Sequence, residues 1–147
     1  MIIDGFLSNY KELKELSLSC EFEDIKNDVD GVSYPDIFLD IPESIRLETI
    51  QKLEEIHKKD ITINKIFMRM TKKGTKPPHF AHTDKIMGSK SLMLYLNDHD
   101  LSGTSFLRHI DSGCMYHPAS EDYVKSIFKD QNDLNKWTRY ISVSSKE

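Results

Sequence analysis

The chain is poor in cysteine and has no long apolar run. Its 147 residues include only two cysteines, Cys20 and Cys114. Two cysteines cannot form a disulfide framework and these are not spaced as a zinc pair, so we expect reduced thiols. No apolar segment approaches membrane-spanning length. The first residues also lack the basic start and apolar stretch of a secretory signal. We therefore expect a cytoplasmic protein with no membrane partner.

Net positive charge is also missing. The formal net charge is −4 at pH 7, whereas proteins that bind a phosphate backbone usually carry clustered positive charge. The basic run at residues 72–76 is interpreted as a solvated loop. Nucleic acid is therefore not an expected partner. With 38% apolar and 30% charged residues, the chain is typical of a soluble protein, and its length predicts a single domain over residues 1–147.

Helical and β-type patterns occupy different parts of the sequence. Apolar spacing predicts one helix over residues 9–18, capped by Ser8, and a second that begins at Pro42. Turn signals predict irregular chain over residues 20–39. Beyond residue 60 the pattern changes to short strands, with one late helix. The strands are expected at 61–70, 80–84, 91–96, 104–110 and 138–143, and the helix at 120–130. The expected fold class is α+β, with helical support over about 1–60 and an antiparallel β-roll over about 61–147.

The clearest chemical signal is the triplet His82-Thr83-Asp84. On an extended strand, residues two apart project from the same face, so His82 and Asp84 can direct an imidazole and a carboxylate to one point. Such a pair suits a divalent metal, and iron(II) oxygenases combine it with a second histidine. The triplet follows a proline-rich turn. After it come Tyr95-Leu96-Asn97 and Gly103-Thr104-Ser105-Phe106.

This order of motifs resembles the iron(II)- and 2-oxoglutarate-dependent oxygenases, particularly the prolyl-hydroxylase-like branch. The runs Asp4-Gly5-Phe6-Leu7 and Asp30-Gly31-Val32-Ser33-Tyr34-Pro35 are similar to the N-terminal portion of that branch, so the resemblance covers most of the chain. It implies a double-stranded β-helix, or jelly-roll, core. It also implies an iron(II) enzyme that uses dioxygen and 2-oxoglutarate to hydroxylate a C–H bond. The implied substrate is a peptidyl proline or a small molecule.

The same resemblance assigns residue roles. It makes His82 and Asp84 the first two iron ligands, as neutral imidazole and ionised carboxylate. In this family the far carboxylate of 2-oxoglutarate is held by a buried cation and often by a hydroxyl. Tyr95 is the candidate hydroxyl, and Arg69 and Arg108 are the candidate cations.

The resemblance breaks near the end of the sequence. The family's second metal histidine and its co-substrate arginine or lysine lie on late strands, and we expect this chain to stop before them. Three histidines lie downstream of the triplet. His109 and His117 are the local candidates for the third ligand, whereas His99 lies in a polar turn and is interpreted as solvated. Three accounts stay open: a fragment of a longer oxygenase, which we favour, a member that binds without turnover, and an enzyme that uses a local histidine. A roll without its closing strands exposes strand edges, which a homodimer or a complementing chain would cover.

Two other functions fit the same residues. In a non-catalytic jelly-roll binding module, His82 and Asp84 only form a hydrogen bond and a pocket holds a ligand without reaction. In a zinc-dependent hydrolytic site, the same pair binds zinc together with a water molecule. Metal analysis separates the module from the two metal sites, and His82→Ala should abolish metal binding in both of the latter.

Overall fold

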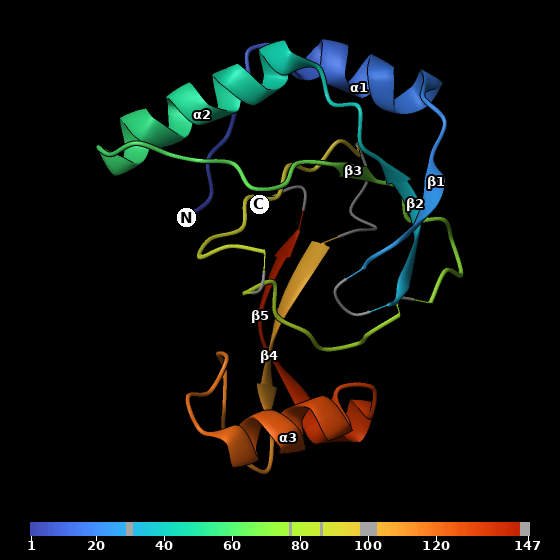
Figure 1. Ribbon diagram of the computed structural model, residues 1–147, viewed down its shortest axis with the longest axis vertical. Helices are drawn as coiled ribbons and strands as arrows, with labels where there is room; N and C mark the ends of the chain where they lie inside the picture. The colour runs from blue at the N-terminus through green and yellow to red at the C-terminus, as the bar shows by residue number, and fades with distance from the viewer. Residues whose placement is uncertain (29–30, 77, 86, 98–102, 145–147) are drawn as a thin grey trace. The chain divides into compact units, whose positions relative to one another are not determined.

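The computed structural model describes residues 1–28, 31–76, 78–85, 87–97 and 103–144. Within these residues the fold is mixed α+β, with three α-helices, one 3-10 helix and two small antiparallel sheets (Figure 1). The α+β class predicted from the sequence is confirmed at this level, and the double-stranded β-helix stays a prediction. The chain divides into two compact units, Met1–Pro78 and His79–Glu147. The single domain expected from the sequence also stays a prediction.

The first unit combines two helices with a three-stranded sheet. The helices are α1 (Tyr10–Ser19) and α2 (Glu43–His57). The strands are β1 (Glu23–Lys26), β2 (Ser33–Phe38) and β3 (Met68–Arg69), in the order β1-β2-β3 with antiparallel neighbours. The buried apolar side chains of this unit form its core, and they are Phe6, Leu7, Leu13, Ile37, Ile45 and Met68.

Both predicted N-terminal helices are present, but their ends differ from the prediction. Ser8 does not cap α1, because Asn9 holds the N-cap position and no side-chain cap bond forms there. The backbone N–H of Ser8 instead donates to Oε1 of Glu48, at 2.6 Å. Helix α2 follows Pro42, whose ring fixes a backbone angle suited to a helix start. The helix ends at His57, and its C-cap residue, Lys58, takes the left-handed conformation with φ 52°.

The segment predicted to be irregular, residues 20–39, contains the β1–β2 hairpin. Backbone hydrogen bonds close its turn, from Asn27 N–H to Val32 C=O at 2.9 Å and from Gly31 N–H to Asn27 C=O at 2.8 Å. Gly31 has φ 69°, a conformation that glycine adopts without steric cost. The turn signal was therefore correct, and the strands on either side of it were missed. The strand predicted at 61–70 is reduced to β3.

The second unit is built on one antiparallel strand pair and one helix. Strand β4 (Gly103–His109) pairs with β5 (Trp137–Ser144), and α3 (Glu121–Asp130) and a 3-10 turn, η1 (Leu134–Lys136), lie between them in sequence. These elements confirm the strands predicted at 104–110 and 138–143 and the helix predicted at 120–130. The structure describes every residue of α3, and none of them is buried. No helix of the described chain has the length and apolar content to cross a membrane.

The strands predicted at 80–84 and 91–96 are not formed, since the described residues of these segments are bends and irregular chain. The backbone donors at the start of this region have other partners. Phe80 N–H donates to Oδ1 of Asn132, and Ala81 N–H donates to the carbonyl of Gln131, each at 3.0 Å. Each residue has one backbone donor, so these two N–H groups do not enter a strand ladder.

A bulge interrupts the β4–β5 pair. Phe106 pairs with Ile141, and the next residue, Leu107, pairs with Arg139. The register therefore leaves Tyr140 without a partner on β4, which is the geometry of a β-bulge.

Candidate functional site

His82 and Asp84 lie together on the loop that begins the second unit. Nε2 of His82 is 3.8 Å from Oδ1 of Asp84, and the two side chains are 53% and 30% exposed. The other carboxylate oxygen of Asp84 accepts a weak hydrogen bond from the Ser91 hydroxyl, at 3.4 Å. The structure thus places the predicted nitrogen and oxygen donors side by side, although the segment that carries them is a loop and not a strand.

This pair is chemically suited to a divalent metal. Two ligand atoms at right angles around a metal, each about 2.1 Å from it, lie roughly 3 Å apart. The 3.8 Å separation of His82 Nε2 and Asp84 Oδ1 exceeds this value by about 0.8 Å, a difference that small side-chain rotations on an exposed loop can close. An imidazole and a carboxylate are ligands that iron, manganese, cobalt and zinc all accept. His82 and Asp84 can therefore supply two of the ligands of such an ion.

The loop is fastened to the chain that follows α3. Besides the backbone donors of Phe80 and Ala81, the His79 ring takes part, since its Nδ1 lies 2.9 Å from Nε2 of Gln131. The amide nitrogen can only donate, so His79 Nδ1 is the acceptor. The three contacts end at Ala81, which is buried, and His82 is the next residue. One ligand of the candidate pair thus follows directly after an anchored segment.

Tyr95, the predicted hydroxyl partner of 2-oxoglutarate, is bonded within the second unit. Its hydroxyl lies 2.7 Å from Oγ1 of Thr104, and the Thr104 hydroxyl donates to the sulfur of Met93 at 2.9 Å. Because Thr104 has one hydrogen to give, the Tyr95 hydroxyl is the donor of their shared bond. This bond joins two of the sequence motifs, Tyr95-Leu96-Asn97 and Gly103-Thr104-Ser105-Phe106.

The two predicted cations are in different units. Arg108 is an exposed residue of β4 in the second unit and pairs with Thr138. Arg69 is an exposed residue of β3 in the first unit and pairs with Ile37. Of the two, Arg108 therefore shares a compact unit with His82, Asp84 and Tyr95.

The candidate third ligands have different surroundings. His109 is fully buried at the end of β4. His117 is half-buried, and its Nδ1 lies 3.0 Å from the carbonyl of Pro118. A carbonyl oxygen only accepts, so Nδ1 carries the hydrogen and the neutral ring keeps its lone pair on Nε2. Metal-bound histidines usually donate their other N–H to such a group. His99 lies outside the described residues.

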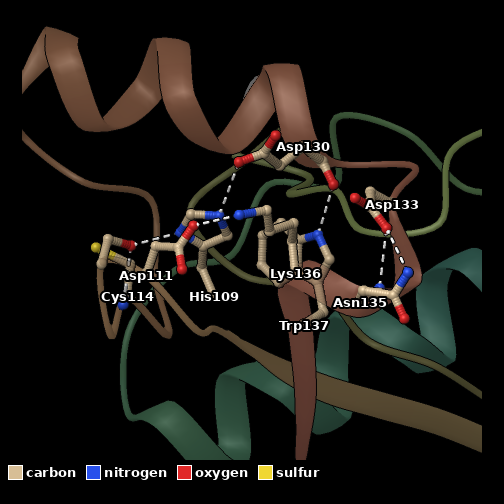
Figure 2. Close-up of polar contacts among 9 residues, drawn as sticks. His109, Asp111, Cys114, Asp130, Asp133, Asn135, Lys136 and Trp137 are labelled. Atoms are coloured by element: carbon tan, nitrogen blue, oxygen red, sulfur yellow. Dashed lines mark hydrogen bonds and ion pairs between the residues drawn. The ribbon is translucent and has the colours of Figure 1, made fainter.

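His109 is the centre of a hydrogen-bond network that the sequence analysis did not identify (Figure 2). Its Nδ1 lies 2.8 Å from the Ser112 hydroxyl, and its Nε2 lies 3.3 Å from Oδ2 of Asp130. The Trp137 ring packs against the imidazole, with 5.0 Å between centroids and a 57° tilt. Both ring nitrogens are therefore engaged, and His109 can ligate a metal only by releasing one of these partners. The available signal was a histidine at a strand end before the turn Asp111-Ser112-Gly113.

A lysine provides the positive charge of this network. Lys136 Nζ lies 2.6 Å from Oδ2 of Asp111. The hydrogen bond and the charge of Lys136 lower the pKa of Asp111, and the same contact raises the pKa of Lys136. His109, Asp111 and Asp130 have ligand atoms within 4.8 Å of one another, and no other such trio occurs among the described residues. A metal at this group would compete with the Lys136 ammonium for Asp111, so the network is best explained as a fold-stabilising one.

Comparison with known proteins adds no relative. No protein-family model, curated protein or solved structure matches the chain. The residues that bear on function are above all His82 and Asp84, together with the contacts that hold their loop.

Proposed function

We propose that this chain is a metal-binding domain of the iron(II)- and 2-oxoglutarate-dependent oxygenase type, with His82 and Asp84 as metal ligands. The observation that carries the proposal is the 3.8 Å approach of a histidine nitrogen and an aspartate oxygen on a partly exposed loop. The order of motifs around the pair supports it. The finer fold in this proposal is a double-stranded β-helix to which β4 and β5 contribute two strands.

The residues of the second unit have separate roles in this proposal. His82 gives a neutral nitrogen and Asp84 an ionised oxygen, so proton binding to either weakens the site. Tyr95 provides the hydroxyl for the far carboxylate of 2-oxoglutarate by turning its O–H from Thr104 to the ligand, with Arg108 as the cation. When bound, iron(II) supplies the oxidation of a substrate C–H bond by dioxygen, with 2-oxoglutarate as co-substrate.

His117 is the histidine we propose as third ligand among the described residues, and it has to move toward His82 and Asp84 to serve, because these three do not form a metal-sized cluster in the structure. Its Nδ1–H is taken by the Pro118 carbonyl, at 3.0 Å, and this leaves Nε2 for a metal. His109 lacks this freedom because Ser112 and Asp130 engage its two nitrogens. The substrate class proposed is a peptidyl proline or a small molecule with an accessible C–H bond.

The test is an anaerobic titration of the chain with iron(II) followed by 2-oxoglutarate, read by the charge-transfer absorption of the chelate. We expect saturable absorption that is lost in His82→Ala and retained in His57→Ala, a histidine variant in the first unit. A folded wild-type chain that gives no absorption contradicts the proposal. Zinc binding without 2-oxoglutarate binding would favour the hydrolytic site, and ligand binding that does not need a metal would favour the binding module.

A further inference from the structure

We propose that Gln131 and Asn132, the two residues after α3, are positioning residues for the metal-binding loop. This inference depends on the proposed metal-binding role of His82 and Asp84. Gln131 and Asn132 do not ligate the metal in this proposal. They hold the chain immediately before His82, so that its imidazole and the carboxylate of Asp84 meet at one point.

The loop before His82 has several contacts to one short segment. Three consecutive loop residues bond to two consecutive residues after the helix. The His79 ring accepts from the Gln131 side chain at 2.9 Å, Phe80 N–H donates to the Asn132 side chain at 3.0 Å, and Ala81 N–H donates to the Gln131 carbonyl at 3.0 Å. A segment held at three successive residues has little backbone freedom left.

The segment that holds the loop is itself fixed within the second unit. Asp130 directly precedes the anchor residues, and Figure 2 shows it bonded to both His109 and Trp137. Its carboxylate lies 3.3 Å from His109 Nε2, and its carbonyl accepts from the Trp137 indole at 2.8 Å. The end of α3 is thus tied to β4 through a side chain and to β5 through the main chain. The loop is therefore attached directly beside this bonded junction.

The consequence concerns metal affinity. A mobile loop loses conformational freedom when a metal fixes two of its side chains, and this loss weakens binding. A loop that is already fixed up to Ala81 has less freedom to lose. Outer contacts that orient metal ligands typically change metal affinity by about 10- to 100-fold when they are removed. Because the anchor acts through the backbone and not on the ligand atoms, we expect roughly ten-fold weaker binding without it.

Asparagine variants give a matched test. Asn132→Ala removes the acceptor for Phe80 N–H, whereas Asn132→Asp keeps an acceptor oxygen there. Asn135→Ala is the control, because the Asn135 side chain bonds to Asp133 within its own turn, at 3.2 Å. Cobalt(II) affinity, measured by its visible absorption without dioxygen or 2-oxoglutarate, is the readout. Amide hydrogen exchange of Phe80 and Ala81 reports the anchor directly.

We expect cobalt(II) to bind roughly ten-fold more weakly to Asn132→Ala, with faster exchange at Phe80. Asn132→Asp should bind at least as tightly as the wild type, and Asn135→Ala should match it. Equal affinities for Asn132→Ala and Asn135→Ala would overturn the positioning role while leaving the metal site intact. If Asn132→Ala does not fold, Gln131→Ala, which removes only the contact to His79, takes its place with the same expected direction.

The two proposals fail in different ways. If the wild-type chain and His82→Ala bind cobalt(II) equally, or neither binds it, the metal-binding role of His82 is wrong and the positioning role falls with it. If His82→Ala abolishes binding and neither Asn132→Ala nor Gln131→Ala weakens it, only the positioning role is wrong.

Discussion

The indole Nε1–H of Trp137 donates a 2.8 Å hydrogen bond to the backbone carbonyl of Asp130. The contact joins the first residue of β5 to the last residue of α3. The same indole packs against His109, whose Nε2 lies 3.3 Å from the Asp130 carboxylate. Trp137 is the single tryptophan of the chain, so its fluorescence reports on this junction within the second unit.

Removing the indole donor should lower the stability of the second unit. Trp137→Phe keeps an aromatic ring against His109 and removes the hydrogen bond to Asp130, and we expect a loss of roughly 1–2 kcal/mol in the free energy of unfolding. Urea denaturation followed by circular dichroism measures it, since the variant has no tryptophan. Phe106→Leu, an aromatic change at an exposed position of β4, is the control. Equal losses in the two variants would contradict a specific role for the indole.

His109 should be the most sensitive histidine for folding. His109→Ala removes a fully buried ring and leaves the partners of both ring nitrogens without it. We expect a destabilisation of about 2–4 kcal/mol, measured by urea denaturation with Trp137 fluorescence. His117→Ala removes a half-buried ring with one local bond and should cost less than about 1 kcal/mol. A His109→Ala variant as stable as His117→Ala would show that the network does not stabilise the unit.

The Asp111–Lys136 pair should respond to acid. Lys136 lowers the pKa of Asp111 through a hydrogen bond and its charge. A lowered carboxyl pKa gives a stabilising contribution that is present above the ordinary value of 3.8 and is lost as the pH falls through the folded value below it. We expect Lys136→Gln to raise the pKa of Asp111 toward 3.8, as measured by carboxyl NMR titration.

Lys136 should show the corresponding effect on stability at high pH. Asp111 raises the pKa of Lys136, so this contribution is present below the ordinary value of 10.5 and is lost as the pH rises through the folded value. Lys125→Gln is a suitable control for both titrations, because Lys125 contacts Glu121 on the exposed side of α3 at 4.0 Å. A Lys136→Gln variant with an unchanged Asp111 pKa would show that the pair does not form in solution.

A glycine at the end of α2 should stabilise the first unit. Lys58 has φ 52°, and its N–H donates to the Glu54 carbonyl at 2.8 Å. A residue with a side chain destabilises the folded state by roughly 1–2 kcal/mol in this conformation, and glycine avoids this cost. Glycine has a smaller cost of its own, about 0.5–1 kcal/mol, because it is more flexible in the unfolded chain. We therefore expect Lys58→Gly to gain about 0.5–1 kcal/mol in thermal or urea denaturation. The neighbouring Lys59→Gly change should give no gain, and a gain of equal size there would contradict this explanation.

Local signals predicted the helices and the last two strands well. Helices α1, α2 and α3 follow apolar spacing, and β4 and β5 follow short β-rich segments bounded by turn residues. The β1–β2 hairpin was missed because neither strand alternates polar and apolar residues: Glu23–Lys26 has one apolar residue and Ser33–Phe38 contains a proline. Turn signals alone do not distinguish a loop from a hairpin. The strand expected at 80–84 does not form, because backbone N–H groups of this segment donate to residues about 50 positions later in the sequence. No local pattern reports a partner at that distance.

The candidate site also combines features that the local sequence predicted with features that it could not predict. The triplet spacing placed His82 and Asp84 together, since neighbours in sequence cannot move far apart. The anchor at Gln131 and Asn132, and the network around His109, depend on contacts between segments that are distant in sequence. The role of Arg108 and the third metal ligand depend on such contacts as well, and they stay predictions.

The bulge at Tyr140 changes the phase of side-chain alternation along β5. Paired residues share a face of the sheet, so Trp137 and Arg139 lie with His109 and Leu107, whereas Ile141 lies with Phe106. Odd-numbered residues of β5 thus face one side before the bulge and the opposite side after it. A deletion of Tyr140 would let Ile141 follow Arg139 directly, in regular alternation and with every later residue still on its present face. The strand should therefore tolerate the loss of this one residue, because no residue of β4 pairs with it.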